Sequence, residues 1–107
     1  MTPDSFKRTT GEAAPPSELS PALQALWWAA KGDWNRAHVL VQDDPSREGA
    51  WVHAYLHRVE GDLGNAAYWY RKAGRPEASD PLEVEWGAIA AALLPATTST
   101  RTGRGAE

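Results

Sequence analysis

The sequence contains no cysteine, and this absence removes several kinds of chemistry at once. Disulfide bonds, thiolate nucleophiles and zinc sites built on Cys all need a thiol, so the chain can form none of them. A Gly-x-Ser-x-Gly motif and a phosphate-cradling glycine loop are absent as well. We therefore predict that the protein is not an enzyme and that it carries no catalytic residue and no cofactor.

Long apolar runs and an excess of positive charge are also missing. No apolar stretch approaches the ~20 residues of a membrane-spanning helix, and the polar N-terminal segment offers none that resembles a signal peptide. The chain has 14 acidic and 11 basic side chains, a net charge of -3, whereas proteins that bind nucleic acid usually present a basic face. We expect a cytoplasmic protein with neither a membrane nor a nucleic-acid partner.

What the sequence does have is tryptophan, with six in 107 residues. A buried indole removes a large apolar area from water, so a few of them can anchor a small core. Apolar residues make up 42% of the chain, an ordinary share for a globular protein. This length and composition predict one domain with a modest core.

The two ends of the chain differ from its middle. Residues 1–18 are polar, contain three prolines and show no apolar periodicity, which predicts a disordered arm. Residues 96–107 are rich in Thr and Gly, and we expect a second disordered tail there. The helical domain is predicted to cover residues 19–95.

Within this domain, apolar residues recur with helical spacing between clear start and stop signals. Ser20, Asp33, Ser46 and Asp62 are each well suited to cap the start of a helix. Glycines and prolines mark the ends. The pattern predicts an all-α protein with helices over residues 20–31, 34–42, 47–60, 63–73 and 81–94.

A short element of the form Gly-Asp-(Trp/Leu)-x-x-Ala occurs twice, beginning at Gly32 and again, 29 residues later, at Gly61. Ala25 and Ala54 are related by the same spacing, and a small residue there permits close approach of two helices. Hairpins related in this way stack on one another in repeat proteins. We predict two tandem helix-turn-helix repeats followed by a C-terminal capping helix.

The second copy of the element, with Tyr70, Ala73 and Pro76 after it, resembles a tetratricopeptide repeat. Residues 50–76 match best, and the first copy matches less closely. The unit is shorter than the 34-residue repeat of that family. Residues 53–62, followed by residues 68–74, also resemble small bacterial helical proteins that have no assigned function, and this resemblance implies a fold only.

Two histidines stand out on the third predicted helix. His53 and His57 are four residues apart, so they share a face, and Glu60 lies three residues further along it. The Glu that completes the HExxH motif is missing, and a metal site needs a further ligand, for which His38 is the only remaining histidine. We predict no metal and a structural or solvated histidine pair.

Two points about these histidines stay open in the sequence. The alternative function is a small-molecule or metal-binding protein that uses His53, His57 and Glu60, and convergence with His38 in one pocket would favour it. Burial is the other point. A helical projection places both histidines opposite the apolar face, whereas the tetratricopeptide alignment puts His57 where an aromatic side chain packs.

The function we expect is a non-catalytic protein–protein interaction module that presents a helical repeat surface. Tyr68 falls outside the apolar stripe of its helix, between Arg71 and Lys72, and an aromatic flanked by cations is a typical contact residue. Trp27 and Trp28 cannot both lie well on one narrow stripe. We expect Trp28 on an uncovered end of the domain, where a homodimer forms or a protein partner docks.

Overall fold

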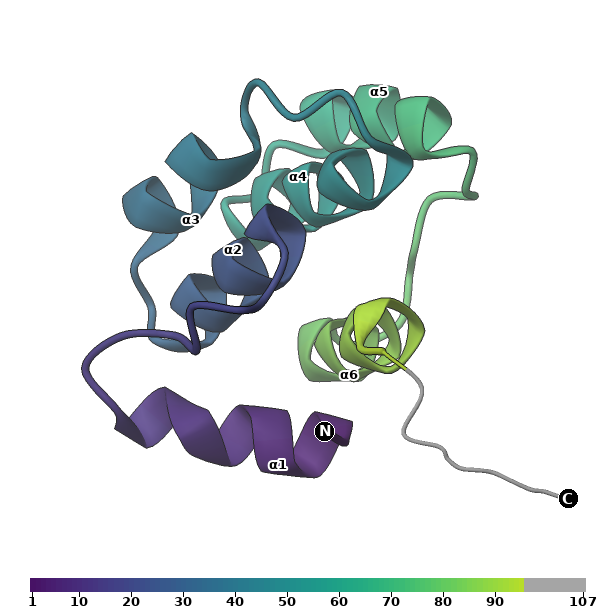
Figure 1. Ribbon diagram of the computed structural model, residues 1–107. Coiled ribbons are helices and arrows are strands. Elements are labelled where there is room, and N and C mark those ends of the chain that lie inside the picture. Colours follow the sequence, from purple (N-terminus) through teal and green to yellow (C-terminus); the bar gives the residue numbers. More distant parts are fainter. Residues whose placement is uncertain (96–107) are drawn as a thin grey trace, which may run out of the picture.

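The computed structural model describes residues 1–95, and in this range the chain forms helices and no strand (Figure 1). In chain order the elements are α1 (Pro3–Arg8), the 3-10 turn η1 (Thr9–Gly11), α2 (Pro21–Ala30), α3 (Trp34–Val41), α4 (Arg47–Val59), α5 (Leu63–Ala73) and α6 (Leu82–Leu93). The all-α prediction is confirmed, and the five predicted helices match α2 to α6 to within one residue at each end. The tail predicted over 96–107 lies outside the described residues.

The helix boundaries follow from side-chain caps. In α2, α3, α4 and α5 the residue before the helix accepts a hydrogen bond from the backbone N–H three positions on, and these residues are Ser20, Asp33, Ser46 and Asp62. Such a bond satisfies one of the N–H groups that have no partner inside the helix. The predicted start signals therefore act through the expected contacts.

Two short turns close the hairpins α2–α3 and α4–α5, and the two turns are alike. Gly32 and Gly61 have φ angles of 83° and 86°, which an L side chain rarely adopts. After them, the backbone N–H of Asp33 donates to the carbonyl of Trp28, and that of Asp62 donates to the carbonyl of His57. Each turn thus reverses the chain and caps the next helix in the same way.

Helix α4 lies at the centre of the molecule (Figure 1) and packs against α2, α3, α5 and α6. Because neighbours surround it, every residue from Gly49 to His57 is buried. The helical projection of the sequence predicts one apolar and one polar face for this helix. In the structure, His53 and His57 are only 3% and 8% exposed, so the side that carries them is covered too.

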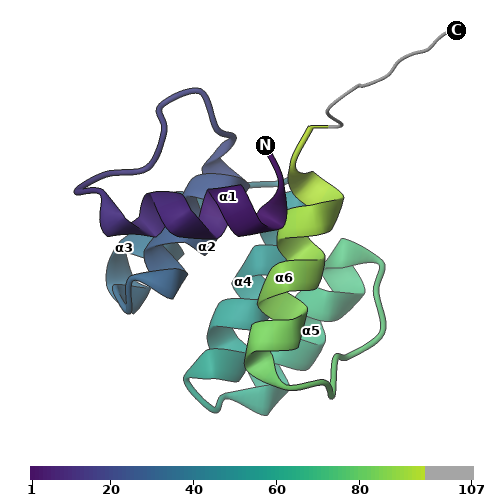
Figure 2. The same ribbon diagram turned by 90° about the horizontal axis from the view of Figure 1, so that it is seen from below.

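The N-terminal segment corrects the prediction of a disordered arm over residues 1–18. Thr2 and Ser5 form a capping box at the start of α1, and Phe6 is fully buried and stacks on Trp86 of α6 with the ring centroids 5.4 Å apart. Thr9 accepts a hydrogen bond of 2.9 Å from Trp27 Nε1. Figure 2 shows α1 extending past α2 to α6. The expectation of a disordered arm is wrong for this segment, because one aromatic side chain anchors it.

A buried carboxylate joins α6 to α4 and α5. Glu85 is 4% exposed, and its carboxylate accepts hydrogen bonds from Trp51 Nε1, from the Tyr70 hydroxyl and from the guanidinium of Arg58. A buried charge is costly unless it is paired and hydrogen-bonded. The indole of Trp86 adds a hydrogen bond of 2.9 Å to the carbonyl of Leu26 in α2.

Across residues 1–95, no helix is long and apolar enough to cross a membrane.

Candidate metal centre

The structure brings all three histidines of the chain together between α3 and α4. His38 comes from α3, and His53 and His57 come from adjacent turns of α4. One ring nitrogen from each histidine can be chosen so that the three atoms lie within 4.8 Å of one another. The convergence of His53 and His57 with His38 is the arrangement that favours the alternative function.

The closest approach within the cluster is between His38 and His53. Their Nε2 atoms are 3.1 Å apart, and the ring centroids are separated by 4.7 Å with the planes almost perpendicular. His57 lies 4.9 Å from His53 and 5.5 Å from His38, centroid to centroid. Three imidazoles therefore surround one small volume.

Two tryptophans form the walls of the cluster. Trp34 stacks on His38 with the ring planes 10° apart, and Trp69 of α5 stacks on His53 with a centroid distance of 3.9 Å. The indole N–H of Trp34 is bonded to the carbonyl of Leu56, which fixes its ring. These flat contacts restrict rotation of the imidazoles and exclude water from their faces. The sequence pattern assigns neither tryptophan this role.

Burial makes protonation of the cluster unfavourable. Desolvation and the neighbouring His38 and His57 lower the pKa of His53 to about 4. Burial also lowers the pKa of His38, and His57 adds to that effect. These two rings are therefore neutral at neutral pH, the form in which an imidazole has a lone pair for a metal ion.

Glu60 orients the third histidine. Its Oε2 lies 2.6 Å from His57 Nδ1 across one turn of helix, and the Glu60 side chain is 38% exposed. A carboxylate on Nδ1 holds the proton there and leaves Nε2 with its lone pair, which is the arrangement common in metal-bound histidines. The predicted site residue Glu60 thus lies beside the cluster and acts on it through His57.

One atom of the cluster has no hydrogen-bond partner in the described part of the chain, and it is the buried Nδ1 of His53. Buried polar atoms without a partner are uncommon and carry a free-energy cost. An apolar residue would fill this place in the core without that cost. Packing alone therefore does not account for a histidine at position 53.

The other predicted site residues lie apart from the histidines. Tyr68 is 45% exposed, with the Arg71 guanidinium and the Lys72 ammonium about 6 Å from its ring, as the sequence indicated. Trp28 is half-buried and the Arg36 guanidinium lies 4.4 Å over its ring. The expectation of an uncovered end on α2 is wrong, because the segment that carries α1 and η1 packs there.

Comparison with known proteins adds no relative to this description. No protein family, no curated protein and no solved structure matches the chain. The function is therefore argued from the site itself.

Proposed function

We propose that this protein binds one divalent transition-metal ion through the Nε2 atoms of His38, His53 and His57. The observation that carries the proposal is the convergence of these three imidazoles from two helices, two of them buried and that of His38 half-buried. Our expectation of no metal depended on the absence of a third ligand with helical spacing. His38 supplies that ligand from the neighbouring helix.

The distances support a shared ion. Zinc–imidazole bonds are about 2.0–2.1 Å long, and tetrahedral geometry then separates two ligand nitrogens by about 3.3 Å. The Nε2 atoms of His38 and His53 are already 3.1 Å apart. One ring nitrogen of His57 lies within 4.8 Å of ring nitrogens of the other two, so small side-chain rotations would complete the set of three ligands.

The ligand set selects the class of metal. Imidazole nitrogen suits zinc, copper, nickel and iron, whereas magnesium and calcium prefer oxygen ligands. Three protein ligands leave one position of a tetrahedral ion for water or another molecule. His38 is only half-buried and Glu60 is exposed, so that position is reached from their side of the cluster. We propose binding without assigning a reaction.

Calorimetric titration of the untagged protein with zinc tests the proposal. We expect one equivalent to bind, and His38→Gln to abolish tight binding, since the pair on α4 alone supplies two ligands. Glu60→Gln should retain one equivalent with affinity lowered about 10–100-fold, the usual effect of removing such an orienting carboxylate.

Tyr68→Ala is the matched control, because Tyr68 is exposed and lies outside the cluster, and it should bind zinc as the wild type does. An absence of zinc uptake would contradict the proposal. Equal affinity in the wild type and His38→Gln would contradict it as well, by showing that any bound zinc does not need the third histidine.

We also propose that α2–α3 and α4–α5 are two units of a tetratricopeptide-like repeat. The two alike Gly-Asp turns support this, and so do the buried alanines at matching places, Ala25 with Ala54 and Ala37 with Ala66. A protein-binding role without catalysis is the second candidate function. The exposed Tyr68 with its two cations favours it, and loss of a partner's binding in Tyr68→Ala would test it.

A further inference from the structure

A groove of about 730 Å³ lies away from the three histidines, none of which lines it. Four parts of the chain line it: the start of α2, the end of α3 with the loop after it, the first turn of α4, and the last turn of α6. Its volume is in the range of about 300–1,000 Å³ that is usual for ligand-binding pockets. Nothing in the proposed metal function uses it.

The walls of this groove are largely apolar. Seven of its lining residues are Ala, Val, Leu or Pro, and these are Pro21, Ala22, Val39, Leu40, Pro45, Ala92 and Leu93. Val39 is 63% exposed, so part of this apolar surface faces the solvent. An exposed apolar surface framed by polar groups is typical of a docking site.

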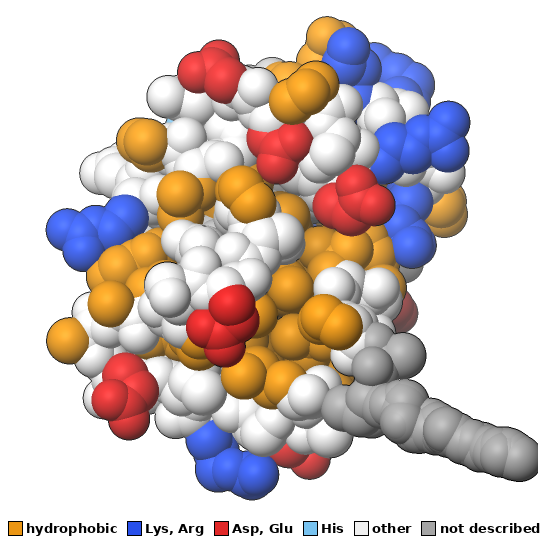
Figure 3. Space-filling view, viewed as in Figure 1, with side chains coloured by type: hydrophobic (Ala, Val, Ile, Leu, Met, Phe, Trp, Pro, Cys, Tyr) orange, Lys and Arg blue, Asp and Glu red, His pale blue; other side chains and the backbone are white. Residues whose placement is uncertain are grey.

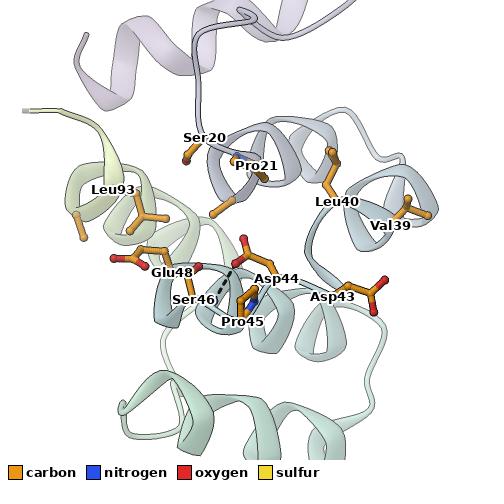
Figure 4. A pocket seen from close by; sticks show the side chains of 12 residues that line it. Ser20, Pro21, Val39, Leu40, Asp43, Asp44, Pro45, Ser46, Glu48 and Leu93 are labelled. Carbon is orange, nitrogen blue, oxygen red and sulfur yellow. Dashed lines mark hydrogen bonds between the residues drawn. The ribbon is translucent and has the colours of Figure 1, made fainter.

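The charged groups in the groove are all of one sign. Asp43, Asp44 and Glu48 line it, and no Lys or Arg is among its lining residues. Figure 4 shows the side chain of Asp44, from the loop after α3, lying between those of Leu40 and Glu48. On the face that Figure 3 presents, the Lys and Arg side chains lie towards the edges, and acidic side chains lie among the apolar ones.

The hydroxyls of the groove already have partners. Ser20 Oγ accepts the N–H of Leu23, and Ser46 Oγ accepts the N–H of Gly49, as helix caps. Asp44 accepts the backbone N–H of Ser46. The exposed carboxylates of Asp43 and Glu48 are therefore the polar groups that remain to recognise an occupant.

We infer that the groove binds a segment of a partner protein that carries apolar side chains beside Lys or Arg. The apolar walls would cover the apolar side chains, and the carboxylates at the rim would pair with the cations. Charge complementarity of this kind sets the specificity and the association rate of an interface. The net charge of -3 on the whole chain reinforces the preference for a basic segment.

Selection of a random twelve-residue peptide library displayed on phage tests the inference, with the untagged full-length chain as the target. We expect the selected peptides to combine Leu, Ile, Phe or Trp with Lys or Arg. Binding of a selected peptide should fall about tenfold or more in Glu48→Lys, because like charges then face each other. It should fall similarly in Val39→Ser, which removes apolar contact without adding charge, and it should weaken as salt is raised.

Both substituted residues are exposed, so the variants should fold, and circular dichroism checks this. Tyr68→Ala, on α5, is the control and should bind the peptides as the wild type does. Selection of acidic or uncharged peptides would overturn the inference, as would unchanged binding in both variants, or self-association of the chain through this face. Peptide binding is measured both with zinc and with a chelator present. Its outcome therefore does not depend on whether the protein binds zinc in the metal titration.

Discussion

Removing the aromatic ring of Phe6 should destabilise the whole domain, although this residue lies in a segment whose sequence predicts disorder. Phe6 is fully buried against Trp86, and truncation of a buried Phe to Ala typically costs about 3–5 kcal/mol. A helix of six residues is not stable alone, so α1 should detach once its anchor is lost. Once α1 has detached, the domain can lose no more stability than the free energy with which this segment docks. We therefore expect the free energy of unfolding to fall by about 3 kcal/mol, the lower end of that range.

For a domain of this size, each kcal/mol lowers the melting temperature by about 4–8 °C, so Phe6→Ala should melt about 12–24 °C lower. Deletion of residues 1–12 should cause a similar loss, since the same contacts disappear. Arg8→Ala, exposed on the same helix, is the control and should melt as the wild type does. Thermal unfolding followed by tryptophan fluorescence measures all four proteins. A melting temperature of Phe6→Ala within roughly 2 °C of the wild type would refute the docking of α1.

Three further results are expected from substitutions in the core. Between pH 7.5 and pH 4.5, the free energy of unfolding of the metal-free wild type, measured with urea, should fall by about 2–3 kcal/mol more than that of His53→Gln. The pKa of His53 is about 4 in the folded protein and about 6.5 in the unfolded chain, so only the unfolded state binds the extra proton in that pH range. Equal losses in the two proteins would contradict the burial of this ring. Ala66→Leu should destabilise by about 1–3 kcal/mol through overpacking, since Ala66 is 3% exposed, and a wild-type melting temperature would show that the repeat alignment is wrong there. Tyr70→Phe should cost about 1–3 kcal/mol because Glu85 loses a donor, while Tyr68→Phe should cost nothing measurable, and equal stability of the two variants would contradict that hydrogen bond.

The helices could be predicted from sequence because their signals are local. A capping side chain such as Ser20 or Asp62 acts on a backbone group only three residues away, so its effect can be read without knowing the fold. Helix α1 could not be predicted in the same way, because its stability comes from contacts with distant residues, above all that between Phe6 and Trp86. A local sequence signal for this helix is the pair Thr2 and Ser5, which forms the capping box at its start.

The candidate site could be predicted only in part for the same physical reason. Helical spacing places His53 and His57 on one face, and Glu60 beside them, which the structure confirms. Whether that face is buried depends on what packs against it, and α3 and α5 both cover it. His38 and the two stacking tryptophans reach the site through this packing, which no spacing within one helix encodes.

The measurement that tests the metal centre most directly is the nitrogen-15 spectrum of the imidazoles during a zinc titration of untagged protein. The chain has three histidines, so every imidazole signal belongs to the proposed site. We predict that the Nε2 resonances of His38, His53 and His57 all move to the values of metal-bound nitrogen and stop changing at one equivalent of zinc. A titration in which one or more of the three stays unchanged at saturation would contradict a three-histidine centre.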